Sequence, residues 1–240
     1  MSLTLIILPV AVALFLSSVI RQISGFGFAL LSMPLITFIA GIRVATPLVA
    51  MAAVMIGLLV LVPSWRAADR PALFRLLLAA VVGIPAGVML FGHLPDEWVK
   101  RGLGTMLILF SIYSFVMPEL PLVQEGRTTW FFGTISGLLT GAFNTGGPPV
   151  VIYGTLRRWQ PESFRATLQL YFLFTSILAL IGHGLAGLWT RDVWLLFLYT
   201  LPGLLAGLYF GDKINLMIPK QLFNRIIYTL LIVTGVLFFL

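Results

Sequence analysis

Two short polar stretches interrupt a chain that is otherwise almost entirely apolar, and both combine hydrogen-bonding side chains with glycine. Backbone that leaves a helix inside hydrocarbon exposes N–H and C=O groups, which is costly unless protein or a polar cavity satisfies them. We therefore expect the two stretches to line a cavity and to bind a polar ligand there. The residues are Arg21, Gln22, Ser24, Gly25 and Gly27 in the first stretch, and Asn144, Thr145, Gly146 and Gly147 in the second.

The ligand that such a cavity favours is an anion. A half-helix that begins at Phe28 or at Gly146 directs free N–H groups and the positive end of its dipole into the cavity. Pro148 and Pro149 agree with this interpretation, because proline is accepted in the first turn of a helix, where its missing N–H is no loss.

Two candidate ligands have alternative interpretations. Arg21 either pairs with the anion or extends its charged end to the membrane interface from the preceding apolar segment. Gln169 lies in a long apolar segment after the second stretch, so it either reaches the cavity or forms a hydrogen bond between helices.

Groups for other chemistry are few. All eight carboxylates lie in loops or at the ends of apolar segments, so we expect facilitated exchange, or coupling through ions or histidine, instead of an acidic proton relay. His93 and His183 are interpreted as capping or interfacial residues. The sequence contains no cysteine, no spacing typical of metal ligands, no nucleophile motif and no phosphate-binding loop. We expect no cofactor, no metal and no enzyme activity.

The composition indicates a membrane protein. Hydrophobic residues make up 60% of the 240 residues and charged residues 10%, whereas soluble domains carry about 25% charged residues. Apolar runs recur along the whole length and the mean hydropathy is +1.06, which indicates several membrane spans. The net charge of +7 comes from lysines and arginines that lie mostly in short loops. This pattern excludes nucleic acid as a partner, since no basic patch with interleaved aromatic residues is present.

Ten apolar segments predict an all-α polytopic membrane protein. Six of them reach or approach the ~20 residues that span a bilayer, namely 44–63, 72–92, 102–117, 166–189, 193–211 and 221–240. The segments 26–40, 130–143 and 146–156 are short and flank the two polar stretches. The first segment, 3–20, is interpreted as a structural helix and not as a cleaved signal peptide.

The two halves of the chain resemble each other. The glycine pair at positions 83 and 87 aligns with the pair at 203 and 207 at an offset of 120 residues, and three further matches keep the same order at offsets from 116 to 124. Matches in order at nearly constant spacing indicate duplication. We expect a first membrane repeat over 1–117, a cytoplasmic connecting loop over 118–129 and a second repeat over 130–240. Each repeat has five helical segments, and each begins with broken or short helices.

Loop charges predict that the repeats have opposite orientations. The loops 64–71, 157–165 and 212–220, with the arginines that follow the first and last of them, each carry three basic residues, whereas 190–192 carries one arginine and one aspartate. Positive residues mark the cytoplasmic side, so both termini are predicted to be periplasmic. Inverted repeats with short, interrupted helices at matching positions are typical of secondary transporters that bind their ligand near the bilayer midplane.

Both polar stretches also resemble the signatures of a known family. Residues 22–30 read QISGFGFAL and are followed by Pro34-Leu35, which is similar to the first signature of the sulfite exporter TauE/SafE family, also called the 4-toluene sulfonate uptake permeases. The second signature is resembled by Gly133, Ser136-Gly137, Thr140-Gly141 and Thr145-Gly146-Gly147-Pro148-Pro149. Many members carry three consecutive glycines where this chain has Gly25-Phe26-Gly27. The resemblance implies transport of sulfite, sulfonates, sulfoacetate, thiosulfate or similar anions across the bacterial inner membrane.

These observations together predict a carrier that exports small sulfur-containing anions by alternating access and binds them between the two half-helix breaks. The alternatives are an anion channel and a carrier for another small organic anion. The expected partners are the anion and the lipid bilayer. The glycines at 203, 207 and 211 form a small-residue face, which suits packing either within the chain or in a homodimer.

Overall fold

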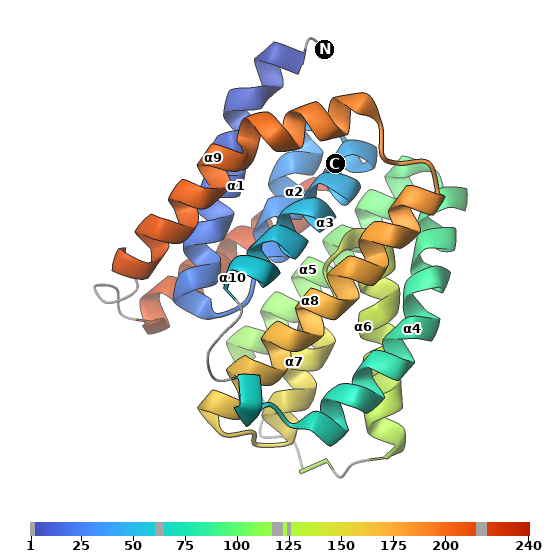
Figure 1. Cartoon of the computed structure of the whole chain (residues 1–240), viewed down its shortest axis with the longest axis vertical. Coiled ribbons are helices and arrows are strands. Elements are labelled where there is room, and N and C mark those ends of the chain that lie inside the picture. The colour runs from blue at the N-terminus through green and yellow to red at the C-terminus, as the bar shows by residue number, and fades with distance from the viewer. Residues whose placement is uncertain (1–2, 61–64, 117–121, 124–125, 215–219) are drawn as a thin grey trace. The chain divides into compact units, whose positions relative to one another are not determined.

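The computed structural model describes residues 3–60, 65–116, 122–123, 126–214 and 220–240, and within them it contains ten α-helices, one short 3-10 helix and no strand (Figure 1). The predicted all-α class is confirmed. The helices are α1 (Leu3–Ser24), α2 (Phe28–Ala40), α3 (Ile42–Leu59), η1 (Trp65–Ala67), α4 (Arg70–His93), α5 (Asp96–Val116), α6 (Arg127–Phe143), α7 (Gly147–Leu156), α8 (Pro161–Leu185), α9 (Arg191–Ile214) and α10 (Lys220–Leu237).

Each α-helix corresponds to one predicted apolar segment, with one correction. Among the described residues, six helices are long and apolar enough to span a membrane, namely α1, α3, α4, α5, α8 and α9. The prediction that the first segment ends at residue 20 was wrong, because α1 continues through Arg21 to Ser24. The predicted final segment, 221–240, corresponds to α10 (Lys220–Leu237), and the side chains of residues 220–224 lie outside the described part of the structure.

The helices form two compact units that are interleaved along the chain. Unit 1 consists of Met1–Val49, Leu94–Pro118 and Trp189–Leu240, and unit 2 consists of Ala50–His93 and Glu119–Leu188. Unit 1 therefore contains α1, α2, α5, α9 and α10, whereas unit 2 contains α4, α6, α7 and α8. Helix α3 crosses the boundary after Val49. Each unit thus combines helices from both predicted repeats.

In unit 1, α1 packs against α9 (Figure 1), and glycines of α9 lie at this contact. A Cβ atom added to Gly203 would lie 2.7 Å from the carbonyl oxygen of Ala11, and one added to Gly207 would lie 2.4 Å from that of Phe15. These distances leave no room for a side chain, so the two backbones are in direct contact, as small residues allow in membranes. The small-residue face is therefore used within the chain and is not available to a second copy.

In unit 2, α4 packs against α6 in the same way (Figure 1). A Cβ atom on Gly83 would lie 2.3 Å from the carbonyl oxygen of Thr134, and one on Gly87 would lie 2.1 Å from that of Leu138. The two glycine pairs that align in the sequence thus have equivalent packing roles. In each unit, the fourth helix of one half contacts the first helix of the other half. This equivalence supports a duplicated chain, while the opposite orientation of the two halves stays a prediction.

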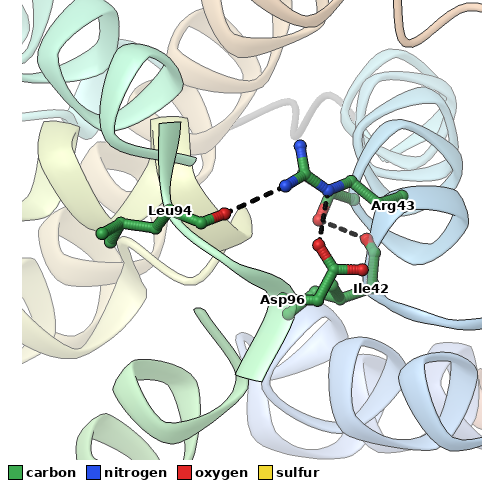
Figure 2. Close-up of polar contacts among 5 residues, drawn as sticks. Ile42, Arg43, Leu94 and Asp96 are labelled. Carbon is green, nitrogen blue, oxygen red and sulfur yellow. Dashed lines mark hydrogen bonds and ion pairs between the residues drawn. The ribbon is translucent and has the colours of Figure 1, made fainter. Parts of the chain in front are cut away.

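An ion pair joins the start of α3 to the start of α5 within unit 1, as Figure 2 shows. Nε of Arg43 lies 2.7 Å from Oδ1 of Asp96, and Nη2 of Arg43 donates to the carbonyl oxygen of Leu94 at 3.0 Å. The contact requires these two helix starts to lie on the same side of a membrane. That agrees with the predicted topology, which places both on the outer side.

Candidate functional site

The first polar stretch forms the turn between α1 and α2 in unit 1. Gly25 (φ 79°) and Gly27 (φ 98°) both adopt the left-handed backbone conformation, which glycine reaches without strain. Gly27 is the N-cap of α2, so this helix begins at Phe28 as predicted. The N–H group of Leu31 donates to the Gly27 carbonyl oxygen at 3.2 Å. The N–H groups of residues 28–30 come before this bond and have no acceptor within the helix. The break therefore offers backbone donors to an anion.

Ser24 closes this turn in the conformation observed. Its hydroxyl group contacts the carbonyl oxygens of Ile20, at 2.8 Å, and of Phe26. A hydroxyl group has one proton to donate, and carbonyl oxygens can only accept it. Ser24 would have to release these contacts before it could donate to an anion.

Arg21 is a buried cation that has no carboxylate partner among the described residues. Its side chain is 7% exposed, and Nη1 donates to Oε1 of the neighbouring Gln22 at 3.4 Å. A buried charge without a counter-charge is costly. The burial disagrees with an arginine that extends to the interface and favours the interpretation in which it pairs with an anion.

The second polar stretch forms the turn between α6 and α7 in unit 2. Asn144 caps the C-terminus of α6 in the left-handed conformation (φ 55°), and its N–H group bonds to the Thr140 carbonyl oxygen at 2.9 Å. Asparagine tolerates this conformation better than most residues do. A Cβ atom on Gly146 would lie 1.9 Å from Oγ1 of Thr140 and 2.4 Å from the Ser136 carbonyl oxygen. Only glycine fits at this position.

The start of α7 carries fewer donors than the start of α2. Gly146 is the N-cap of α7, and the helix begins at Gly147. The next two residues are Pro148 and Pro149, which have no N–H group. Among the first three residues of α7, the backbone donor is therefore that of Gly147. The second break attracts an anion through its helix dipole and side chains more than through a row of amides.

A buried hydroxyl network fixes the second break and was missed by the sequence analysis. The Tyr171 hydroxyl on α8 donates to Oγ of Ser136 on α6 at 2.8 Å, and Ser136 donates to the carbonyl oxygen of Gly146. Tyr171 is completely buried. Ser136 belongs to the residues that resemble the second family signature. The sequence does not indicate that a tyrosine 35 residues away completes the network.

Two predicted ligands of unit 2 have buried polar atoms that lack a partner among the described residues. These atoms are Oγ1 of Thr145 and Oε1 of Gln169, and Thr145 is 1% exposed. Buried polar atoms are nearly always hydrogen-bonded, so an exception calls for a ligand or a water molecule. For Gln169, the alternative of a hydrogen bond between helices is not realised at Oε1. The Thr145 hydroxyl is available to donate to an anion.

His183, in the last turn of α8, contacts the end of α6, and its position relative to the membrane interface stays a prediction. It is completely buried on α8. Its Nε2 lies 2.9 Å from the carbonyl oxygen of Gly141, near the end of α6. The interpretation as a capping residue is closer, although His183 caps a neighbouring helix and not its own.

The candidate ligands thus fall into two groups. Arg21, Gln22, Ser24, Gly25 and Gly27 all lie in unit 1, while Asn144, Thr145, Gly146, Gly147 and Gln169 all lie in unit 2. Each unit has one break with its own set of polar groups. That both groups bind the same anion stays a prediction.

Comparisons with known proteins identify the family of the chain. The model of the family described as "Sulfite exporter TauE/SafE" matches residues 10–238. A protein of Cupriavidus necator described as "Probable sulfite/organosulfonate exporter TauE" is 31% identical over 112 residues, which are 43% of each chain. The match thus spans less than half the length of that relative. No solved structure matches the chain.

Proposed function

Because this chain belongs to the sulfite exporter TauE/SafE family, a family of membrane transporters, we propose that it exports small sulfur-containing anions from the bacterial cytoplasm. The substrate class comprises sulfite, sulfoacetate and other organosulfonates. The protein moves them by alternating access, with donors from the half-helix breaks around the anion. Its localisation in this proposal is the inner membrane, with both termini in the periplasm.

The observation that carries the proposal is the burial of Arg21 beside the first break. A guanidinium group offers a planar set of donors that matches the oxygen atoms of a sulfonate or sulfite group. Its described hydrogen-bond partner is the neutral side-chain amide of Gln22. A bound anion would compensate the buried charge.

The membrane potential can drive the export of an anion without a proton relay of acidic residues. Among the described residues, no aspartate or glutamate is buried, so the membrane spans provide no buried carboxylate to carry a proton. An anion that leaves a cell with a negative interior moves down the membrane potential, which provides about 2.3 kcal/mol per charge for each 100 mV. Facilitated export therefore needs no further energy source while the outer concentration is low.

Efflux from proteoliposomes tests the proposal. Vesicles that contain the purified protein should release radiolabelled sulfite or methanesulfonate with saturable kinetics, and external substrate should accelerate this exchange. Arg21→Ala and Asn144→Ala should both slow it, whereas Arg191→Ala, which removes an exposed arginine from α9, should not. If both site variants transport every sulfur anion at the wild-type rate, the site assignment is wrong. Single-channel currents would indicate a channel.

A further inference from the structure

The side-chain amide of Gln22 connects the buried cation of unit 1 to an exposed carboxylate. Nη1 of Arg21 donates to Oε1 of Gln22 at 3.4 Å, and Nε2 of Gln22 donates to Oδ1 of Asp212 at 2.7 Å. A guanidinium group can only donate and an ionised carboxylate can only accept. Only one orientation of the amide satisfies both neighbours. Gln22 is therefore engaged on both sides, and its donor faces Asp212.

Close helix packing brings Asp212 to this position. A Cβ atom on the adjacent Gly211 would lie 2.8 Å from Cβ of Gln22 and 3.0 Å from Cα of Val19. Only a glycine allows α9 to approach α1 so closely at this turn. Asp212 and Gln22 are 190 residues apart in the chain, so the contact exists only because the two helices pack together.

The nearest cation on α9 is directed elsewhere. Nζ of Lys213 donates to the hydroxyl group of Tyr209 at 2.8 Å and lies 4.4 Å from the centre of the tyrosine ring. Among the described residues, the hydrogen-bond partner of the Asp212 carboxylate is Gln22. The carboxylate of Asp212 is thus connected to the guanidinium group of Arg21 through the side-chain amide of Gln22.

We propose that Asp212 is a specificity-determining residue of the carrier, which positions Arg21 through Gln22 and makes the site favour singly charged anions over doubly charged ones. This inference rests on the proposed function. One negative charge on a ligand is compensated by Arg21. A second negative charge on the ligand adds less binding free energy, because the carboxylate of Asp212 repels it. Since Asp212 is exposed, solvent and salt weaken the repulsion, and its effect on relative affinity is about three- to tenfold.

A comparison of two anions of different charge tests the inference. Methanesulfonate carries one negative charge and thiosulfate carries two, and the binding of each to the purified full-length protein is measured by calorimetry. Asp212→Asn removes the charge and retains an oxygen atom that accepts from Gln22. We expect this variant to shift the ratio of the two affinities toward thiosulfate by about three- to tenfold. Asp212→Glu, which restores the charge, should restore the wild-type preference.

The chain offers a matched control on the same helix. Asp192→Asn removes one negative charge from the first turn of α9, whereas Asp212 lies at the other end of this helix. This control should leave the affinity ratio unchanged. A general effect of net charge would instead shift the ratio equally in both variants, and this result would overturn the inference.

A second variant separates positioning from charge. Gln22→Leu removes the amide but leaves the carboxylate of Asp212 in place. We expect both affinities to fall by a similar factor, because Arg21 loses its support while the charge near the site is unchanged. If Gln22→Leu leaves both affinities at the wild-type level, the positioning role is excluded.

The results also distinguish this inference from the proposed function. If neither anion binds the wild-type protein, or if Arg21→Ala leaves both affinities unchanged, the proposed function fails and the inference fails with it. If both anions bind and depend on Arg21, but Asp212→Asn leaves their ratio unchanged, only the inference is overturned. A melting temperature near that of the wild type confirms that each variant is folded.

Discussion

Nε2 of His183 donates to the carbonyl oxygen of Gly141 at 2.9 Å, and this bond connects the last turn of α8 to the end of α6. In a continuous helix, that carbonyl would accept from the N–H group of Thr145. Here the helix stops, and Thr145 donates to the carbonyl oxygen of Leu139 instead. His183 thus replaces a bond that the break has removed.

Removal of the His183 side chain should therefore destabilise unit 2. His183→Ala leaves the Gly141 carbonyl oxygen buried without its donor, and we expect a cost of about 1–3 kcal/mol. The melting temperature of the purified protein should fall by several degrees. His93→Ala is the matched control, since His93 is exposed and contacts the carbonyl oxygen of Met89 within its own helix. An equal effect of both substitutions would contradict the capping role.

Gly146 should tolerate no side chain, whereas its neighbour should. The Cβ atom of Gly146→Ala would overlap with Thr140 and with the backbone of Ser136, while that of Gly147→Ala would lie 3.5 Å from the nearest atom, in the ring of Phe172. We expect Gly146→Ala to cost at least about 1–3 kcal/mol. The yield of monodisperse protein in detergent and its melting temperature should distinguish the two variants. A stable Gly146→Ala protein would mean that the break has a different geometry.

The equivalent glycines of the two units should respond alike. Gly87→Ala places a Cβ atom 2.1 Å from a carbonyl oxygen of α6, and Gly207→Ala places one 2.4 Å from a carbonyl oxygen of α1. Both substitutions should lower the melting temperature by a similar amount, because each separates a fourth helix from a first helix. Gly92→Ala meets no atom within 4 Å and is the control. A large difference between Gly87→Ala and Gly207→Ala would argue against equivalent units.

Arg21 should contribute to anion binding through the geometry of its donors as well as through its charge. Arg21→Lys keeps a cation but loses the planar pair of donors that suits a sulfonate group. We expect Arg21→Ala to weaken methanesulfonate binding at least about tenfold, in line with a hydrogen bond to a charged group. Arg21→Lys should have an intermediate effect. Titration calorimetry measures both affinities, and equal affinities for arginine and alanine at this position would exclude contact with the ligand.

The absence of cysteine from the sequence allows a direct test of topology. Thr190→Cys lies between α8 and α9 and should react with an impermeant maleimide in intact spheroplasts. Gln160→Cys, between α7 and α8, should react only after the membrane is permeabilised. These outcomes follow from the predicted excess of positive residues on the cytoplasmic side. The reverse pattern would invert the predicted orientation of the whole chain.

The helices and breaks could be predicted from the sequence because their causes are local. Gly27 and Gly146 precede new helices, and Gly41 caps the end of α2. The end of α1 was misplaced because arginine is a good helix former. Its charge ends an apolar run without ending the helix.

The partners of the site residues could not be predicted, because they come from distant parts of the chain. Tyr171 with Ser136, His183 with Gly141 and Gln22 with Asp212 are 35, 42 and 190 residues apart. Such contacts depend on which helices pack together. The sequence shows the small residues that permit close packing, but it does not show which helix will occupy each groove.

The interleaving of the units sets an order for assembly during synthesis. All the helices of unit 2 precede Trp189, whereas unit 1 requires α9 and α10, which follow it. Helix α1 enters the membrane first, yet the glycines of α9 that it packs against are translated in the last part of the chain. Until then Gln22, the neighbour of Arg21, cannot contact Asp212. Unit 1 can therefore be completed only after all the helices of unit 2 have been synthesised. A ribosome paused after α8 should therefore carry a folded unit 2 and an α1 that has not yet packed against α9.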